Sequence, residues 1–84
     1  MYMGRETYVA ITIYTTPTCS YCTVAKEFFR ANHIAFTEYN VVNDRRRAEE
    51  MLKKSGQMGV PVIDINGKIL VGFNKSEIEK TLKR

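Results

Sequence analysis

The sequence has little of what marks a disulfide-stapled or metal-binding domain: two cysteines, one histidine and no tryptophan in 84 residues. Small secreted domains usually carry four or more cysteines at wide spacings. A bond between Cys19 and Cys22 would close a loop too short to constrain the unfolded chain much. A structural zinc site needs four ligands, and His33 adds only one to the two cysteines. We therefore expect neither a structural disulfide nor an intrachain metal site.

Long apolar runs are also absent. The early run at residues 8–14, YVAITIY, is short, and no small-residue cleavage site follows it. No run approaches the ~20 residues that a membrane-spanning helix needs. We therefore expect a cytoplasmic protein that does not contact a membrane.

The charge balance is moderately basic. Thirteen Lys and Arg against nine Asp and Glu give a formal charge of +4, and the densest cluster is at residues 45–47, RRR. This cluster is interpreted as a solvated helix face or as a basic surface that steers an acidic protein or an anionic thiol substrate. No helix-turn-helix, zinc-finger or aromatic RNA-binding signature accompanies the charge, so we expect no nucleic-acid partner.

The composition, 44% apolar and 26% charged, is that of a folded globular domain, and the length fits one domain at residues 1–84. Residues 8–14 combine β-branched and aromatic side chains and predict a strand buried on both faces. Residues 20–31 carry apolar side chains at helical spacing, with Thr18 as the expected capping hydroxyl. Residues 34–41, IAFTEYNV, predict a second strand, and the helix between the two favours a parallel crossover.

The second half of the chain continues the alternation. Residues 43–56 predict a helix with Ala48, Met51 and Leu52 on one stripe and Gly56 at its end. Asn66-Gly67 between two apolar runs is typical of a two-residue hairpin turn. A capping box at residues 74–77 then predicts a short terminal helix. The expected order is βαβαββα.

The two cysteines are the residues most suited to chemistry. At positions i and i+3 of one helical turn, their Cβ atoms lie about 5–6 Å apart, a spacing that suits reversible disulfide formation as well as shared metal binding. Unpaired N–H groups and the macrodipole stabilise an anion at a helix N-terminus. Cys19, nearer that end, is therefore expected to be the attacking thiolate, and Cys22 fits the role of the thiol that resolves a mixed disulfide.

Val60-Pro61 stands directly before a predicted strand, where proline is tolerated. It is interpreted either as a plain strand start or as a cis peptide bond, since X–Pro bonds alone adopt cis at low cost. We adopt the cis hypothesis. A cis bond would expose the Val60 backbone to an extended substrate and bring Pro61 beside the thiol.

Three ordered motifs resemble the glutaredoxin family, over about residues 8–83. Cys19-Ser20-Tyr21-Cys22 is similar to the family's Cys-Pro-Tyr-Cys, and residues 55–62, SGQMGVPV, are similar to its Ser-Gly-x-x-Thr-Val-Pro. Residues 70–82, LVGFNKSEIEKTL, resemble the Gly-Gly-x-Asp segment that opens the last helix. The resemblance implies an α/β, thioredoxin-like fold, a four-stranded mixed sheet flanked by three helices. It also implies a monomeric thiol–disulfide oxidoreductase that acts on disulfide-containing proteins.

The resemblance also implies the residues around the thiols. Tyr21, Val60 and Pro61 would shape the substrate groove, and Phe73 is interpreted equally as a groove or a core residue. Glutathione is a possible co-substrate, with no tightly bound cofactor expected. Neutral contacts to it would come from Gln57, the Val60 backbone, Gly72 and Asn74.

Several positions depart from the family pattern. Thr16 stands where many members have lysine, Met58 and Gly59 replace a basic residue and a threonine, and Asn74 replaces an aspartate. These departures remove charged groups that hold glutathione in family members. Residues 71–73, VGF, also resemble glutaredoxin-like donors that take electrons from thioredoxin reductase, such as those serving ribonucleotide reductase. The expected reductant is therefore glutathione or a thioredoxin-reductase-type enzyme.

A different class of function stays open. Ser20 replaces the inner proline and so frees a backbone N–H beside the sulfur. Hydrogen bonds to sulfur tune iron–sulfur clusters. Two chains, each giving Cys19, would then hold a cluster together with thiols from elsewhere.

Overall fold

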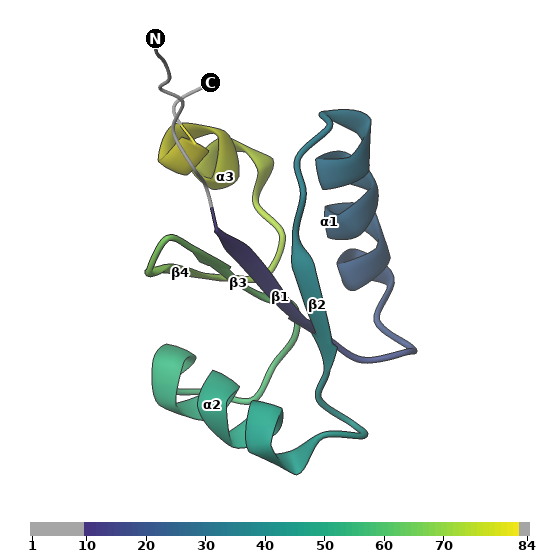
Figure 1. The fold of residues 1–84 in the computed structure, drawn as a ribbon, viewed down its shortest axis with the longest axis vertical. Coiled ribbons are helices and arrows are strands. Elements are labelled where there is room, and N and C mark those ends of the chain that lie inside the picture. Colours follow the sequence, from purple (N-terminus) through teal and green to yellow (C-terminus); the bar gives the residue numbers. More distant parts are fainter. Residues whose placement is uncertain (1–9, 83–84) are drawn as a thin grey trace, which may run out of the picture.

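The structure, a computed structural model, describes residues 10–82 and shows the predicted order of elements (Figure 1). Within this range no helix is long and apolar enough to cross a membrane. The elements are β1 (Ile11–Thr15), α1 (Ser20–Ala31), β2 (Thr37–Asn40), α2 (Arg45–Ser55), β3 (Val62–Ile65), β4 (Lys68–Val71) and α3 (Lys75–Leu82).

The four strands form one mixed sheet in the order β2-β1-β3-β4. β1 runs parallel to β2, as the helix between them predicted, and β3 runs antiparallel to both β1 and β4. The hairpin is confirmed at Asn66 and Gly67, whose φ angles of 51° and 94° are those of a two-residue turn with both central residues left-handed.

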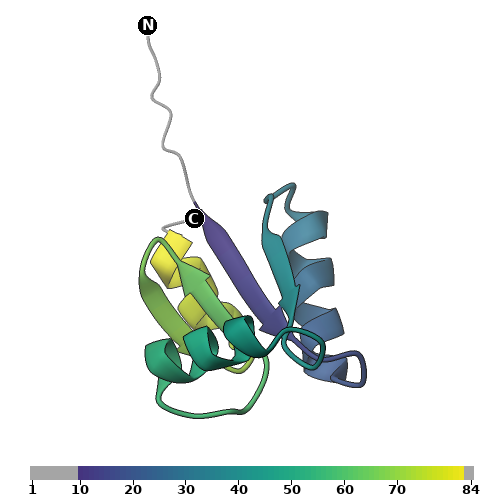
Figure 2. The same cartoon turned by 60° about the horizontal axis from the view of Figure 1, so that its bottom comes forward.

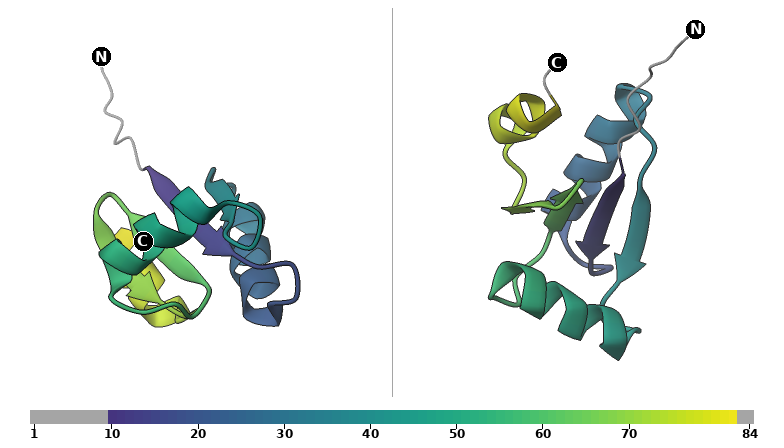
Figure 3. Two further views of the ribbon diagram at one scale, coloured as in Figure 1. Left: turned by 90° about the horizontal axis from the view of Figure 1, so that it is seen from below. Right: turned by 60° about the vertical axis from the view of Figure 1, so that its left-hand side comes forward.

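The central strand β1 is buried on both faces because helices cover the sheet from both sides. Ile11 and Ile13 point into a core shared with α1 and α3, whereas Tyr14 points into a second core that includes Met51 of α2. Figures 2 and 3 show α2 on one side of the sheet with α1 and α3 on the other. The predicted thioredoxin-like architecture is confirmed.

Several local predictions need correction. β1 begins at Ile11, and residues 8–9 lie outside the described range. β2 begins only at Thr37, which pairs with Thr12 of β1. Ile34 and Phe36 precede the strand and pack against the core shared by β1, α1 and α3. The cap of α1 is not Thr18, because the Cys19 side chain itself accepts the capping hydrogen bond.

Leu52 also differs from its prediction as a core residue. Only Met51 of α2 is buried, and Leu52 is 43% exposed. Adjacent residues on a helix point about 100° apart, so Met51 facing the sheet turns Leu52 towards the outside.

Candidate active site

Three loops meet at one end of the sheet. Thr15, the last residue of β1, lies opposite Asn40 at the end of β2, and Tyr14 lies opposite Val62 at the start of β3. Val71, at the end of β4, also lies opposite Val62. The cysteine loop after β1, the proline segment before β3 and the segment after β4 therefore share one edge, although they are far apart in the sequence.

Cys19 is the N-cap of α1. Its backbone is extended, with φ −90° and ψ 110°, and its Sγ accepts a hydrogen bond from the Cys22 N–H at 3.1 Å. Its own N–H donates to the carbonyl of Thr16 at 3.3 Å, which fixes the loop that leads into the helix. The sulfur is half-buried and lies where unpaired N–H groups and the helix dipole stabilise negative charge. This geometry suits a nucleophilic thiolate that solvent and substrate can reach.

Cys22 is the inner thiol, one turn further on. It is buried, and both cysteines are free thiols in this structure. Burial raises the pKa of the Cys22 thiol to about 12, with a further contribution from its interaction with Cys19. Cys22 therefore stays protonated and unreactive until a reaction at Cys19 changes its surroundings.

A charged cluster that the sequence did not indicate lies beside Cys22. Lys26, one turn after Cys22 on α1, pairs with Glu38 of β2 at 2.8 Å. The same Glu38 oxygen accepts a hydrogen bond at 2.7 Å from the hydroxyl of Thr15, which is buried. The bonds from Lys26 and Thr15 lower the pKa of Glu38, and the Lys26 charge opposes the rise in the pKa of Cys22. The sequence feature that could have indicated this cluster is Lys26 itself, four residues after Cys22.

The hypothesis that the Val60–Pro61 bond is cis is confirmed. Pro61 is fully buried, and its carbonyl accepts the N–H of Gly72 at 2.8 Å. This bond ties the segment before β3 to the segment after β4. Val60 is half-buried and packs against the core on the α2 side.

The Gln57 side chain holds the same loop. Its Oε1 accepts the Gly59 N–H at 2.6 Å, and its Nε2 donates to the Gly59 carbonyl at 3.1 Å and to Ser55 Oγ at 3.3 Å. The amide is thus engaged within the loop that precedes the cis bond. Met58, inside this loop, is 57% exposed.

The segment after β4 contains the remaining predicted residues. Gly72 has φ 81°, which glycine adopts without strain. Phe73 is half-buried and packs edge-on against Phe28 with ring centroids 5.9 Å apart, an arrangement that favours the core interpretation. Asn74 Oδ1 accepts the Glu77 N–H at 3.1 Å and so caps α3, as predicted.

Two further side chains, Tyr21 and Asp64, lie on different parts of the fold. Tyr21, between the cysteines, is 66% exposed and stays a predicted groove residue. Asp64 bonds to Lys54 of α2 at 2.7 Å and to the Gly67 N–H at 2.7 Å, so it is engaged on the α2 side of the sheet. Among residues 10–82 there is no group of three or more His, Cys, Asp and Glu side chains that would hold a metal ion.

The fold and the paired cysteines define a thioredoxin-fold protein with a Cys-x-x-Cys site, and comparison with known proteins is more specific. The glutaredoxin family model matches residues 11–70. The chain therefore belongs to the glutaredoxin family.

Individual relatives agree with this assignment. The chain is 49% identical over 74 residues to an uncharacterized glutaredoxin-like 8.6 kDa protein in the rubredoxin operon of Clostridium pasteurianum, covering 88% of this chain and 99% of that one. It is 36% identical over 62 residues to glutaredoxin 3 of Escherichia coli K12, and the match covers 74% of this chain and 75% of that one. It also resembles the structure of the glutaredoxin-like protein NrdH-redoxin from Escherichia coli, with a TM-score of 0.76, 28% identity and coverage of 84% and 92%.

Proposed function

We propose that this protein is a thiol–disulfide oxidoreductase that reduces disulfides in proteins. The Cys19 thiolate attacks one sulfur of the substrate disulfide, the substrate S–S bond breaks, and the other substrate sulfur leaves as a thiolate that takes a proton. Cys22 then loses its proton and attacks Cys19 Sγ, which releases the second substrate thiolate. The substrate gains two electrons, and the protein is left with a Cys19–Cys22 disulfide.

The observation that supports this function best is the difference between the two thiols. The Cys19 sulfur is half-buried at a helix N-terminus and accepts an N–H hydrogen bond, whereas Cys22 is buried with a raised pKa. Two-step exchange requires one thiol that attacks the substrate and a second thiol that stays protonated until the mixed disulfide has formed. A structural role would not need this inequivalence, because a bond between these neighbours constrains little chain.

The disulfide must be reduced again by an external donor, and we propose that glutathione is a weak one. Each charged hydrogen bond to glutathione contributes ~1.5–3 kcal/mol, and ~1.4 kcal/mol corresponds to tenfold in affinity. Thr16, Met58 and Asn74 replace charged residues, so recognition would fall by more than about a hundredfold. The net charge of +4 offsets only a diffuse part of this loss, because salt screens it.

A thioredoxin-reductase-type enzyme is the alternative donor. The structure of NrdH-redoxin is described as the basis for a thioredoxin-like activity profile of a glutaredoxin-like protein, and its 28% identity to this chain motivates the comparison. The Asn74 amide, engaged in capping α3, supports the same proposal because it offers glutathione no charge.

The test is turnover of a disulfide substrate with two reducing systems side by side: glutathione with glutathione reductase, and thioredoxin reductase with NADPH. We expect turnover with the second system, slow turnover with the first, and none with Cys19→Ser in either. Asn74→Asp keeps a side chain that can cap α3 and should speed the glutathione reaction. Brisk glutathione turnover that Asn74→Asp does not improve would contradict the proposed reductant. If the protein reduces no disulfide with either reducing system, small disulfides included, the result would contradict the function itself.

A further inference from the structure

One face of α2 that the core does not use combines apolar and charged side chains. Arg45, Ala48, Glu49 and Leu52 follow the spacing of this face, and together with Met58 they line an open hollow of about 250 Å³. Leu52 and Met58 are 43% and 57% exposed. Exposed apolar side chains gathered around a hollow mark a binding surface more often than singly scattered ones do.

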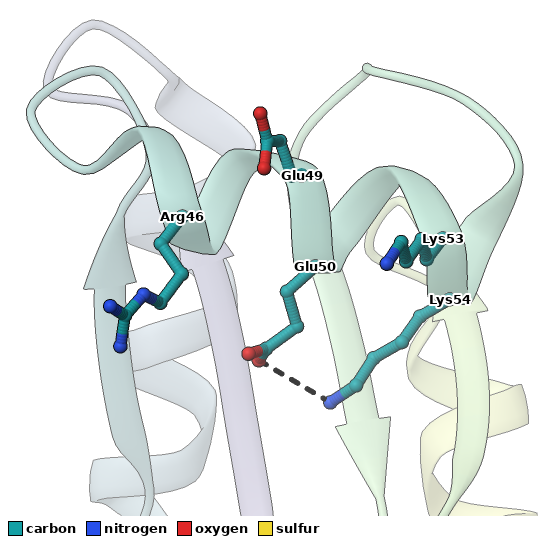
Figure 4. Close-up of a pocket in the computed structure, with 5 residues that line it drawn as sticks. All are labelled: Arg46, Glu49, Glu50, Lys53 and Lys54. Carbon is teal, nitrogen blue, oxygen red and sulfur yellow. Dashed lines mark ion pairs between the residues drawn. The ribbon is translucent and has the colours of Figure 1, made fainter.

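The same helix presents uncompensated positive charge. A neighbouring open hollow of about 420 Å³ is lined by Arg46, Glu49, Glu50, Lys53 and Lys54 (Figure 4). Lys54 is paired with Glu50 and Asp64. Within residues 10–82, Arg45, Arg46 and Lys53 have no ion pair, and Glu49 is the one carboxylate without a cation among the residues lining the two hollows. The surface therefore favours an occupant that supplies carboxylates.

This surface adjoins the dithiol site. Met58 lies three residues before Pro61, a stretch of chain that spans at most about 10 Å. A segment seated against Leu52 and Met58 would thus continue directly into the edge of the sheet where the cysteine loop and the cis bond meet.

We propose that this α2 face, defined by Arg45, Arg46, Ala48, Leu52, Lys53 and Met58, binds an acidic segment of the protein whose disulfide exchanges with Cys19. An apolar side chain of that segment fills the hollow between Leu52 and Met58, and its carboxylates face Arg45, Arg46 and Lys53. The surface selects among disulfide partners rather than taking part in the sulfur chemistry. This inference rests on the proposed oxidoreductase function.

The test uses synthetic peptides that contain one disulfide and an arm of several residues. The arms carry glutamates around a leucine, lysines around a leucine, or glutamates around an alanine. Single-turnover reduction by the reduced protein gives the rate constant for each peptide. We expect the acidic leucine arm to react fastest, since each exposed ion pair changes affinity by up to about fivefold. Its advantage should shrink between about 0.01 M and 0.15 M salt, as the screening length falls from about 30 Å to about 8 Å.

Variants assign the preference to this surface. Arg45→Glu places an acidic residue in the first turn of α2, where it suits the helix dipole, and Leu52→Gln changes an exposed position. Each should lose at least about half of the preference, while reduction of bis(2-hydroxyethyl) disulfide stays as in the wild type. Lys68→Glu makes the same charge change at the opposite end of the sheet and should keep the preference.

Equal rates for the acidic and basic arms would overturn the inference, as would a preference that persists in Arg45→Glu and Leu52→Gln. A concentration-dependent dimer that Leu52→Gln abolishes would assign this face to a second copy of the chain instead. Failure to reduce even the small disulfide would count against the oxidoreductase function, so the two failures are distinguishable.

Discussion

The sharpest consequence of the site geometry is that Cys22 should resist alkylation at a pH where Cys19 reacts. With a pKa of about 12, about one Cys22 thiol in 10⁴ is ionised at pH 8. An unperturbed thiol with a pKa of ~8.5 would be about one quarter ionised at that pH. The raised pKa therefore lowers the ionised fraction of Cys22 by roughly 10³-fold relative to an ordinary thiol. The greater nucleophilicity of a high-pKa thiolate offsets only part of that loss, and burial slows the reaction further.

The assay is a time course of iodoacetamide labelling of the fully reduced protein at pH 8, with the label located by tandem mass spectrometry. We expect Cys19 to be labelled first, with almost no product carrying the label at Cys22 alone. The same protein in concentrated urea provides the control, because unfolding removes the burial and should make the two rates similar. Comparable rates at Cys19 and Cys22 in the folded protein would refute the assignment of the attacking and resolving thiols.

Three further predictions concern stability. Tyr14→Phe removes a buried hydroxyl that bonds to Glu50 and Lys54, and should lower the free energy of unfolding by ~1–2 kcal/mol. Each kcal/mol lost should lower the Tm by about 4–8 °C. An unchanged Tm would show that the hydroxyl bonds contribute nothing. Gly67→Ala at φ 94° should cost ~1–2 kcal/mol in urea unfolding. Because burial raises the pKa of Cys22 in the folded state, the free energy of unfolding of the reduced protein should fall by up to ~1.4 kcal/mol per pH unit between pH ~8.5 and ~12. Cys22→Ser should flatten that pH profile.

The elements and topology were predictable because local patterns agree with the final fold. Asn66 and Gly67 specify their turn through backbone conformation alone, whatever surrounds them. The seven-residue apolar run around β1 likewise predicts a strand covered on both sides, which the structure bears out. Such features need no knowledge of distant residues.

The features that were missed depend on packing between elements. Glu38 meets Lys26 only because β2 pairs with β1 in the register that sets Glu38 opposite Ile13, with α1 above that pair. Leu52 was expected in the core because its spacing fits a helix stripe, yet the sheet admits only Met51. Spacing within one helix does not say how wide a stripe the neighbouring sheet can cover.

The claim that Cys19 attacks and Cys22 resolves is tested most directly by trapping the mixed disulfide. Each variant and the wild type are reduced, mixed with bis(2-hydroxyethyl) disulfide and examined by intact mass spectrometry. We expect Cys22→Ser to keep a mercaptoethanol adduct on Cys19, whereas the wild type should release it and end two hydrogen masses lighter, as the intramolecular disulfide. Cys19→Ser should form little adduct at Cys22, which is buried with a pKa raised to about 12. A stable adduct on Cys22 of Cys19→Ser, with none on Cys19 of Cys22→Ser, would contradict the account.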